Sequence, residues 1–161
     1  MFDLEKIALQ AGAALKENEQ TIAVAESSSG GLICAALLAV PGASSYFKGG
    51  GVVYTSQAKT LLVEVSAEAM AADRAATETH ALHLARAARE RLGADWGIGE
   101  TGAAGPTGNR YGDAAGHCCI GIAGPREETI TITTNSDERA ANMQAFASAA
   151  IELLQKCVER R

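Results

Sequence analysis

The sequence predicts an α/β protein: a three-layer α/β/α sandwich around a mixed sheet, formed as a single domain by residues 1–161. Apolar residues make up 47% of the chain and charged residues 20%, the composition of a globular domain with a sizeable core. Segments with helical spacing alternate with short apolar segments, as in a sheet covered by helices on both faces. Late in the chain, strands expected over 117–123 and 129–134 flank Gly124-Pro125-Arg126, which predicts an antiparallel hairpin.

The first half of the chain predicts two strands, each followed by a helix. Asp3 can cap an initial helix, because apolar residues follow it at helical spacing. Residues 21–25 are apolar and bounded by polar residues, so we expect a buried strand there, followed by a helix over 32–40. A second strand is expected over 51–55 and a short helix over 57–63.

The second half contains the clearest helix, over residues 77–92, where apolar residues share one face and Gly93 stands at the position of a C-terminal glycine. A third strand is expected over 95–100, before the hairpin. Ser136 is expected to cap a final helix. The apolar face of that helix carries Met143, Phe146, Ala147, Ala150, Leu154 and Cys157.

Charge and hydropathy exclude several classes of partner. The net charge of −5 and the absence of a Lys/Arg cluster argue against nucleic acid, because nothing would neutralise a phosphate backbone. No apolar run approaches the roughly 20 residues of a membrane-spanning helix, so we expect no membrane insertion. The first residues show neither the basic stretch nor the apolar segment of a secretion signal, which favours a cytoplasmic location.

The cysteines and histidines predict no metal centre. The four cysteines fit no zinc spacing and are interpreted as reduced, mostly buried small hydrophobes. They are Cys34, Cys118, Cys119 and Cys157. His80 and His83 lie three positions apart on one helix, but no acidic residue or cysteine at ligand spacing completes a site around them.

Three serines and two glycines follow the first strand, in Glu26-Ser27-Ser28-Ser29-Gly30-Gly31. A hydroxyl group between a strand and a helix meets free backbone N–H groups and the positive end of the helix dipole. Such groups stabilise an oxyanion or bind an anionic ligand. Serine is also a favoured N-cap, so plain capping is the alternative.

Lys59 follows the second strand, close to Tyr54. A desolvated lysine acts as a general base once its pKa falls, and a Ser/Lys pair is a known means of activating a hydroxyl group. The alternative is a solvated lysine on a short helix, with Tyr54 a half-buried strand residue. Only the fold can bring Lys59 to Ser27.

A glycine-rich segment, Thr101-Gly-Ala-Ala-Gly-Pro-Thr-Gly108, follows the third strand. Its backbone N–H groups could hold a phosphate group. The segment matches neither the dinucleotide-binding fingerprint nor the P-loop, so a generic loop is the alternative.

Together these segments resemble the CinA C-terminal domain family over nearly the whole chain. Ala25–Gly31 is similar to the family's Ala-Glu-Ser-Cys-Thr-Gly-Gly motif, and 40–47, 50–59 and 101–106 match the next blocks in order. The resemblance implies a nicotinamide-nucleotide amidase that hydrolyses nicotinamide mononucleotide (NMN) to nicotinate mononucleotide and ammonia. It implies neither metal nor organic cofactor, and a stand-alone amidase without the N-terminal domain of longer members.

The resemblance also implies roles for individual residues. The nucleophile falls on Ser27 and the general base on Lys59, with Tyr54 assisting proton transfer. Backbone N–H groups from Ser28 to Gly31 would hold the oxyanion, and the Arg139 fork suits the NMN phosphate. The substrate-binding residues implied are Ser28, Ser29, Gly30, Gly31, Thr101, Gly102, Gly105 and Arg139.

The chain departs from the family pattern at several positions. Ser28-Ser29 stands where Cys-Thr is usual, Ala103 where isoleucine is common, and Arg74-Ala-Ala-Thr-Glu78 where the family has Gly-Ala-Val-Ser-Glu. These changes leave the Ser/Lys pair intact and bear on substrate affinity and identity. Two other functions stay open: a nucleotide-binding module without turnover, and a competence or damage-inducible regulatory role. The oligomeric state is also open, a homodimer included.

Overall fold

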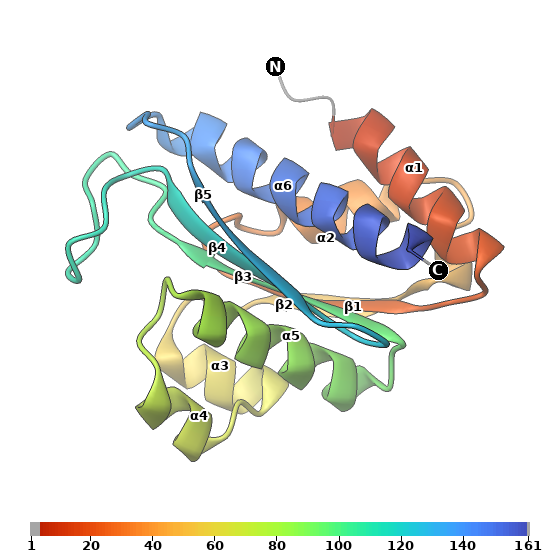
Figure 1. The fold of residues 1–161 in the computed structure, drawn as a ribbon, viewed down its shortest axis with the longest axis horizontal. Coiled ribbons are helices and arrows are strands. Elements are labelled where there is room, and N and C mark those ends of the chain that lie inside the picture. The colour runs from red at the N-terminus through yellow and green to blue at the C-terminus, as the bar shows by residue number, and fades with distance from the viewer. Residues whose placement is uncertain (1–3, 161) are drawn as a thin grey trace.

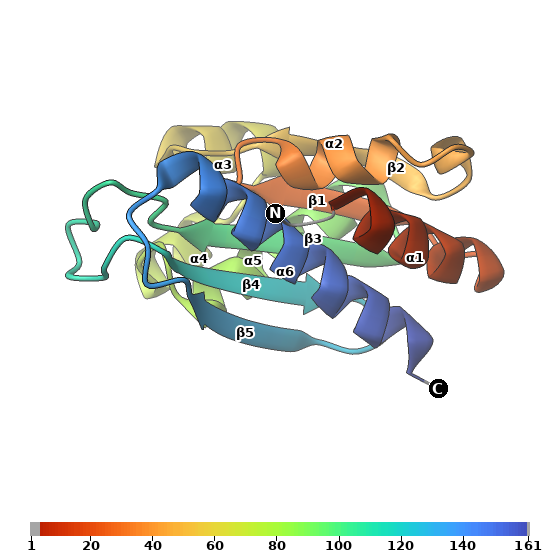
Figure 2. The same ribbon diagram turned by 90° about the horizontal axis from the view of Figure 1, so that it is seen from above.

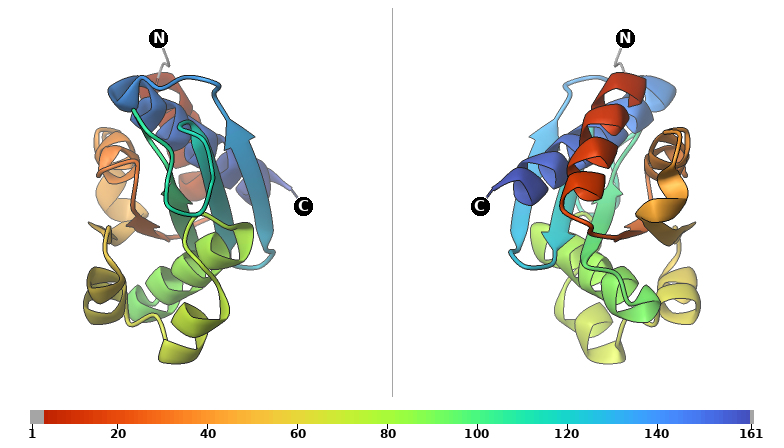
Figure 3. Two further views of the ribbon diagram at one scale, coloured as in Figure 1. Left: turned by 90° about the vertical axis from the view of Figure 1, so that its left-hand side faces the viewer. Right: turned by 90° about the vertical axis from the view of Figure 1, so that its right-hand side faces the viewer.

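The computed structural model describes residues 4–160, which form three layers (Figures 1 and 2). One face of the sheet carries α1 (Leu4–Glu17), α2 (Leu32–Leu38) and α6 (Arg139–Glu159). The other face carries α3 (Ser56–Val63), α4 (Ala67–Ala72) and α5 (Glu78–Leu92). A 3₁₀ turn, η1, spans Ala43–Ser45. The expected α/β/α sandwich is confirmed, and Figure 3 shows its layers end on.

Five strands form one mixed sheet in the order β2-β1-β3-β4-β5. They are β1 (Ile22–Glu26), β2 (Phe47–Val52), β3 (Trp96–Gly102), β4 (His117–Ala123) and β5 (Glu128–Thr133). β1 runs parallel to both β2 and β3, whereas β3, β4 and β5 are antiparallel neighbours, so the expected hairpin is confirmed. The chain leaves β1 for β2 on one side and later returns to β3 on the other. The carboxyl end of β1 is therefore a topological switch point, where α/β sheets bind their ligands.

Alternation along the strands sorts their side chains between the two helical layers. In β1, Val24 packs with the layer of α1, α2 and α6, while Ala23 and Ala25 pack with α3 and α5. Helix α5 lies so close to β3 that a Cβ atom at Gly99 would collide with the carbonyl oxygen of Ala81. The small side chains of this layer thus let helices approach the sheet closely.

The edge strand β2 begins at Phe47, so the strand expected over 51–55 is wrong in its bounds. Glycines supply its ladder with β1, and a Cβ atom at Gly50 would meet the Sγ of Cys34. By Val53 the strand has ended, and the Thr55 hydroxyl already accepts the Ala58 N–H at 3.1 Å to cap α3. A pattern that scores apolar side chains misses a strand built on glycine backbone.

Helix ends agree with the sequence at α5 and disagree at α6. Thr77 caps α5 through the N–H of His80, and Gly93 ends it with a φ of 61°. α6 begins at Arg139 with Glu138 as its N-cap, so the expected capping by Ser136 is wrong. The Ser136 hydroxyl instead accepts the N–H of Glu138 at 3.1 Å, within the turn that precedes the helix.

The remaining expectations concern α6, the N-terminal cap, the cysteines and membrane insertion. The apolar face expected on α6 is confirmed, and α4 is a helix that the sequence pattern did not indicate. The expected cap Asp3 lies outside the described residues. All four cysteines are free, and all but the half-buried Cys34 are buried. Within residues 4–160, none of the helices combines the length and apolar character needed to cross a bilayer.

Candidate active site

Ser27 follows directly on β1, at the switch point of the sheet. Continuing the alternation of Ala23 and Ala25 places it toward the layer of α3 and α5. The side chain of Glu100 anchors the backbone of Ser27, because the Ser27 N–H donates to Glu100 Oε2 at 2.9 Å. Only 7% of Ser27 is exposed. The predicted nucleophile is therefore nearly buried, and its backbone is anchored by the carboxylate of Glu100.

The three adjacent serines differ in what their hydroxyl groups contact. Ser28 Oγ donates to Glu100 Oε1. Ser29 Oγ lies 2.6 Å from Glu26 Oε1 and 2.8 Å from Glu100 Oε2, so it links two buried carboxylates. The hydroxyl of Ser27 has no hydrogen-bond partner among residues 4–160. Of the three, Ser27 alone keeps a hydroxyl group free for chemistry in the described part of the chain.

Lys59 lies on α3, in the helical layer that covers Ala23 and Ala25. It stands one turn before Val63 on α3, and Val63 packs in the core cluster of Ala23 and Ala25. Only 3% of Lys59 is exposed, so the alternative of a solvated lysine is wrong. Burial lowers the pKa of Lys59 below its ordinary value, and the negative charge of Glu100 opposes part of that shift.

Glu26 and Glu100 are fully buried carboxylates that organise this site, and the sequence interpretation gave neither of them a role. Glu26 Oε1 accepts the Gly31 N–H at 2.8 Å, and its Oε2 accepts the Cys34 N–H at 2.9 Å. It thereby supplies the first turn of α2 with its acceptor. Glu26 is the last residue of β1 and Glu100 lies two residues before the end of β3, so both stand near the carboxyl ends of neighbouring parallel strands. That placement is the signal that could have found them.

The expected oxyanion hole, formed by the N–H groups of Ser28 to Gly31, is wrong for three of the four donors. The Ser29 N–H donates to Glu100 Oε2 at 2.9 Å, the Gly30 N–H to the Ser27 carbonyl at 3.1 Å, and the Gly31 N–H to Glu26. Gly30 and Gly31 instead form the turn, with φ angles of 65° and 97°. Within residues 4–160, the Ser28 N–H is the one left without an acceptor.

A cleft of about 210 Å³ opens beside Ser28. It brings together five of the predicted residues: Ser28, Tyr54, Gly102, Gly105 and Arg139. Arg139, the first residue of α6, donates from Nη1 to the Gly105 carbonyl at 2.5 Å, which holds the guanidinium group against the loop. Tyr54 is 61% exposed at the cleft wall rather than half-buried in a strand.

Four predicted substrate-binding residues do not line the cleft: Ser29, Gly30, Gly31 and Thr101. The predicted catalytic residues Ser27 and Lys59 do not line it either. Thr101 is 2% exposed, and its hydroxyl group accepts the N–H of Ala76 at 3.0 Å. Ser29 is fully buried between the two glutamates. Both side chains support the walls of the site, because their hydroxyl groups are used by neighbouring segments.

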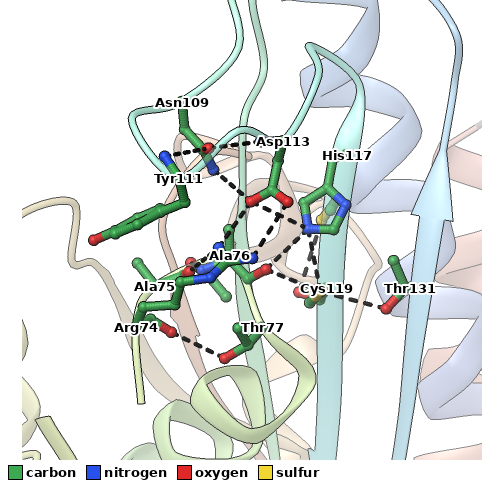
Figure 4. A network of polar contacts seen from close by, with 12 residues as sticks. Arg74, Ala75, Ala76, Thr77, Asn109, Tyr111, Asp113, His117, Cys119 and Thr131 are labelled. Atoms are coloured by element: carbon green, nitrogen blue, oxygen red, sulfur yellow. Dashed lines mark hydrogen bonds and ion pairs between the residues drawn. The ribbon is translucent and has the colours of Figure 1, made fainter. Parts of the chain in front are cut away.

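The loop over 103–116 is fastened to the segment before α5 by a polar network (Figure 4). Arg74 pairs with Asp113 at 2.8 Å, and Asn109 donates to the same carboxylate at 2.8 Å. His117 Nε2 lies 2.9 Å from the Ala76 carbonyl oxygen. This network holds the outer wall of the cleft in place.

His80 lies on α5 within electrostatic reach of Lys59. It is 1% exposed, and neither ring nitrogen has a hydrogen-bond partner among residues 4–160. Burial, together with the positive charge of Lys59, lowers the pKa of His80 to about 4. The imidazole is therefore neutral near pH 7. His83, in contrast, faces Asp73 at 3.4 Å.

Residues 4–158 match the family model described as the CinA C-terminal domain. The chain is 41% identical over 145 residues to a CinA-like protein of Chlorobium limicola, and 37% identical over 159 residues to one of Desulfosudis oleivorans. These alignments cover 87% and 97% of this chain but 34% and 38% of the relatives, so the chain spans about a third of their length. A solved CinA-superfamily protein of Escherichia coli aligns with a TM-score of 0.88 at 26% identity, over 97% of this chain and 93% of that one. A competence/damage inducible protein of Agrobacterium tumefaciens aligns with a TM-score of 0.90 at 25% identity, over 99% and 98%.

Proposed function

This chain belongs to the family of the CinA C-terminal domain, and we propose that it is a nicotinamide-nucleotide amidase, which hydrolyses NMN to nicotinate mononucleotide and ammonia. The observation that carries the proposal is the contrast among the three serines. Ser27 keeps a free hydroxyl group, whereas the hydroxyl groups of Ser28 and Ser29 are bound by carboxylates. The buried Lys59, whose pKa is lowered, supports the assignment of a base.

In this mechanism Lys59 acts as a general base in its neutral form. It takes the proton of Ser27 Oγ, which attacks the carboxamide carbon of NMN to give a tetrahedral intermediate. The Ser28 N–H, which keeps no acceptor among residues 4–160, is the donor assigned to the developing oxyanion. Ammonia leaves with the proton from Lys59, and an acyl-enzyme ester that retains the ribosyl phosphate remains on Ser27. A water molecule, activated by Lys59, hydrolyses this ester.

Substrate specificity is assigned to the cleft. Arg139 has five N–H donors, of which one is used by the Gly105 carbonyl, so its fork keeps donors for the NMN phosphate. Tyr54 forms an exposed aromatic wall that suits contact with the nicotinamide ring or a proton-transfer role beside Lys59. Serine and lysine perform the chemistry without a metal ion or organic cofactor.

The test is to incubate the purified protein with NMN in the presence of EDTA and to measure ammonia and nicotinate mononucleotide. We expect both products in equal amounts, and loss of both in the Ser27→Ala variant. Binding of NMN by calorimetry without any release of ammonia would instead support a nucleotide-binding module. Such a module would fit the regulatory role that the names of competence or damage-inducible relatives suggest.

A further inference from the structure

We propose that Glu100 is a positioning residue of this site: it holds Ser27 by its backbone and binds the hydroxyl groups of Ser28 and Ser29, so that one serine alone is left for the reaction. The inference rests on the proposed amidase function. It assigns a role to a buried carboxylate of β3 that the mechanism above does not use.

The contacts of Glu100 leave no acceptor capacity unused. Its Oε2 accepts the N–H groups of Ser27 and Ser29, both at 2.9 Å, and faces Ser29 Oγ at 2.8 Å. Its Oε1 accepts from Ser28 Oγ and from the Cys118 thiol at 3.4 Å. An ionised carboxylate is an acceptor only, with about four lone-pair sites. A glutamine amide would offer one oxygen and turn its NH₂ group toward N–H and O–H donors.

These contacts control the direction of the nucleophile. The N–H groups of Ser27 and Ser29 both donate to Glu100 Oε2, so this carboxylate fixes the backbone of the turn that carries Ser27 Oγ. A misplacement of about 1 Å in a reacting group can cost on the order of 100-fold in rate. Glu100 therefore acts on turnover through the geometry of Ser27, without contact with substrate.

Glu100 also acts on the base. Its negative charge raises the pKa of Lys59 and so opposes the effect of burial. The titratable groups around this corner include Glu26 on β1, Cys34 on α2, Cys118 on β4 and His80 on α5. His83 and Asp73 lie within electrostatic reach of His80. His80 and the Cys118 thiol are neutral, since burial lowers the pKa of the former and raises that of the latter. Removing the Glu100 charge should therefore lower the pKa of Lys59 further.

The experiment compares Glu100→Gln with Cys118→Ala, which touches Glu100 without contacting Ser27 and serves as the matched control. We expect Glu100→Gln to lower kcat about 10- to 100-fold with KM changed by less than about threefold. The acidic limb of the kcat/KM profile should move to lower pH. Cys118→Ala should leave kcat, KM and the pH profile unchanged.

A second readout does not depend on activity. The chain has five lysines, so NMR titration of protein labelled with ¹³C-lysine can follow the Lys59 side chain, assigned by Lys59→Arg. We expect Glu100→Gln to lower the pH at which Lys59 titrates. If wild-type protein does not hydrolyse NMN, this titration still tests the coupling of Glu100 to Lys59 and separates its failure from that of the proposed function.

A folded Glu100→Gln variant with wild-type kcat would overturn the proposal. A loss of kcat with an unchanged titration of Lys59 would also overturn it, and would indicate a merely structural role. If Glu100→Gln does not fold by circular dichroism, Glu100→Asp decides the question. Its shorter side chain keeps the charge but cannot reach every donor, so kcat should fall while the titration of Lys59 stays close to wild type. Wild-type turnover in Glu100→Asp would overturn the proposal.

Discussion

Replacing Arg139 with alanine should weaken the binding of NMN and spare substrates that lack a phosphate group. Arg139 lines the cleft beside Gly105 and Tyr54, and one of its five N–H donors is already bound to the Gly105 carbonyl. Hydrogen bonds to a charged group contribute about 1.5–3 kcal/mol. Loss of the fork should therefore raise KM for NMN roughly 10- to 150-fold, because every 1.4 kcal/mol corresponds to a factor of ten.

The assay compares NMN with nicotinamide riboside, which carries the same carboxamide and ribose without the phosphate group. Arg139→Ala should change the kcat/KM for the riboside by less than about threefold, since the remaining contacts are shared. Arg110→Ala is the control, because Arg110 stacks on Tyr111 and does not line the cleft. Equal losses on both substrates would refute the phosphate role, and would indicate that Arg139 acts by holding the loop at Gly105.

Two further predictions concern the buried charges. Activity should rise with pH as Lys59 loses its proton, and this rise should fall below the ordinary pKa of 10.5, because burial lowers the pKa of Lys59. The Lys59→Arg variant should be nearly inactive, since a guanidinium group does not give up its proton. An Arg variant that keeps most of its turnover would remove Lys59 from the mechanism. Glu26→Ala leaves the N–H groups of Gly31, Ile33 and Cys34 without their carboxylate acceptor. Urea unfolding should therefore show that the free energy of unfolding falls by about 3–5 kcal/mol. A decrease below about 1 kcal/mol would contradict the role of Glu26 in capping α2.

Local signals in the sequence predicted most of the fold. Helix α5 was located by apolar spacing together with Thr77 and Gly93, and all of these act within one segment. β2 was misplaced because its pairing depends on the glycine backbone and on the neighbouring β1, which no local pattern contains. The cap of α6 was misplaced for a similar reason, since the side chain of Asn142 reaches back to the Ser136 carbonyl at 2.8 Å and shapes the turn before the helix.

The site was predicted in its residue types but not in its contacts. Without the family resemblance, local pattern does not separate Ser27 from its two neighbours, because the difference lies in Glu100, 73 residues away in the chain. The same carboxylate takes the N–H group of Ser29, which the sequence had assigned to an oxyanion hole. The burial of Lys59 likewise depends on the packing of α3 against α5. Long-range contacts of this kind appear only in the folded chain.

The central claim is that Ser27 forms a covalent bond to the substrate. The most direct measurement is mass spectrometry after brief mixing with NMN and an acid quench, applied to a peptide that spans residues 21–48. We predict an acyl group on Ser27 in the wild-type protein and on no residue of this peptide in Ser27→Ala. An adduct on Ser28 or Ser29, or turnover by Ser27→Ala at a nearly normal rate, would contradict the account.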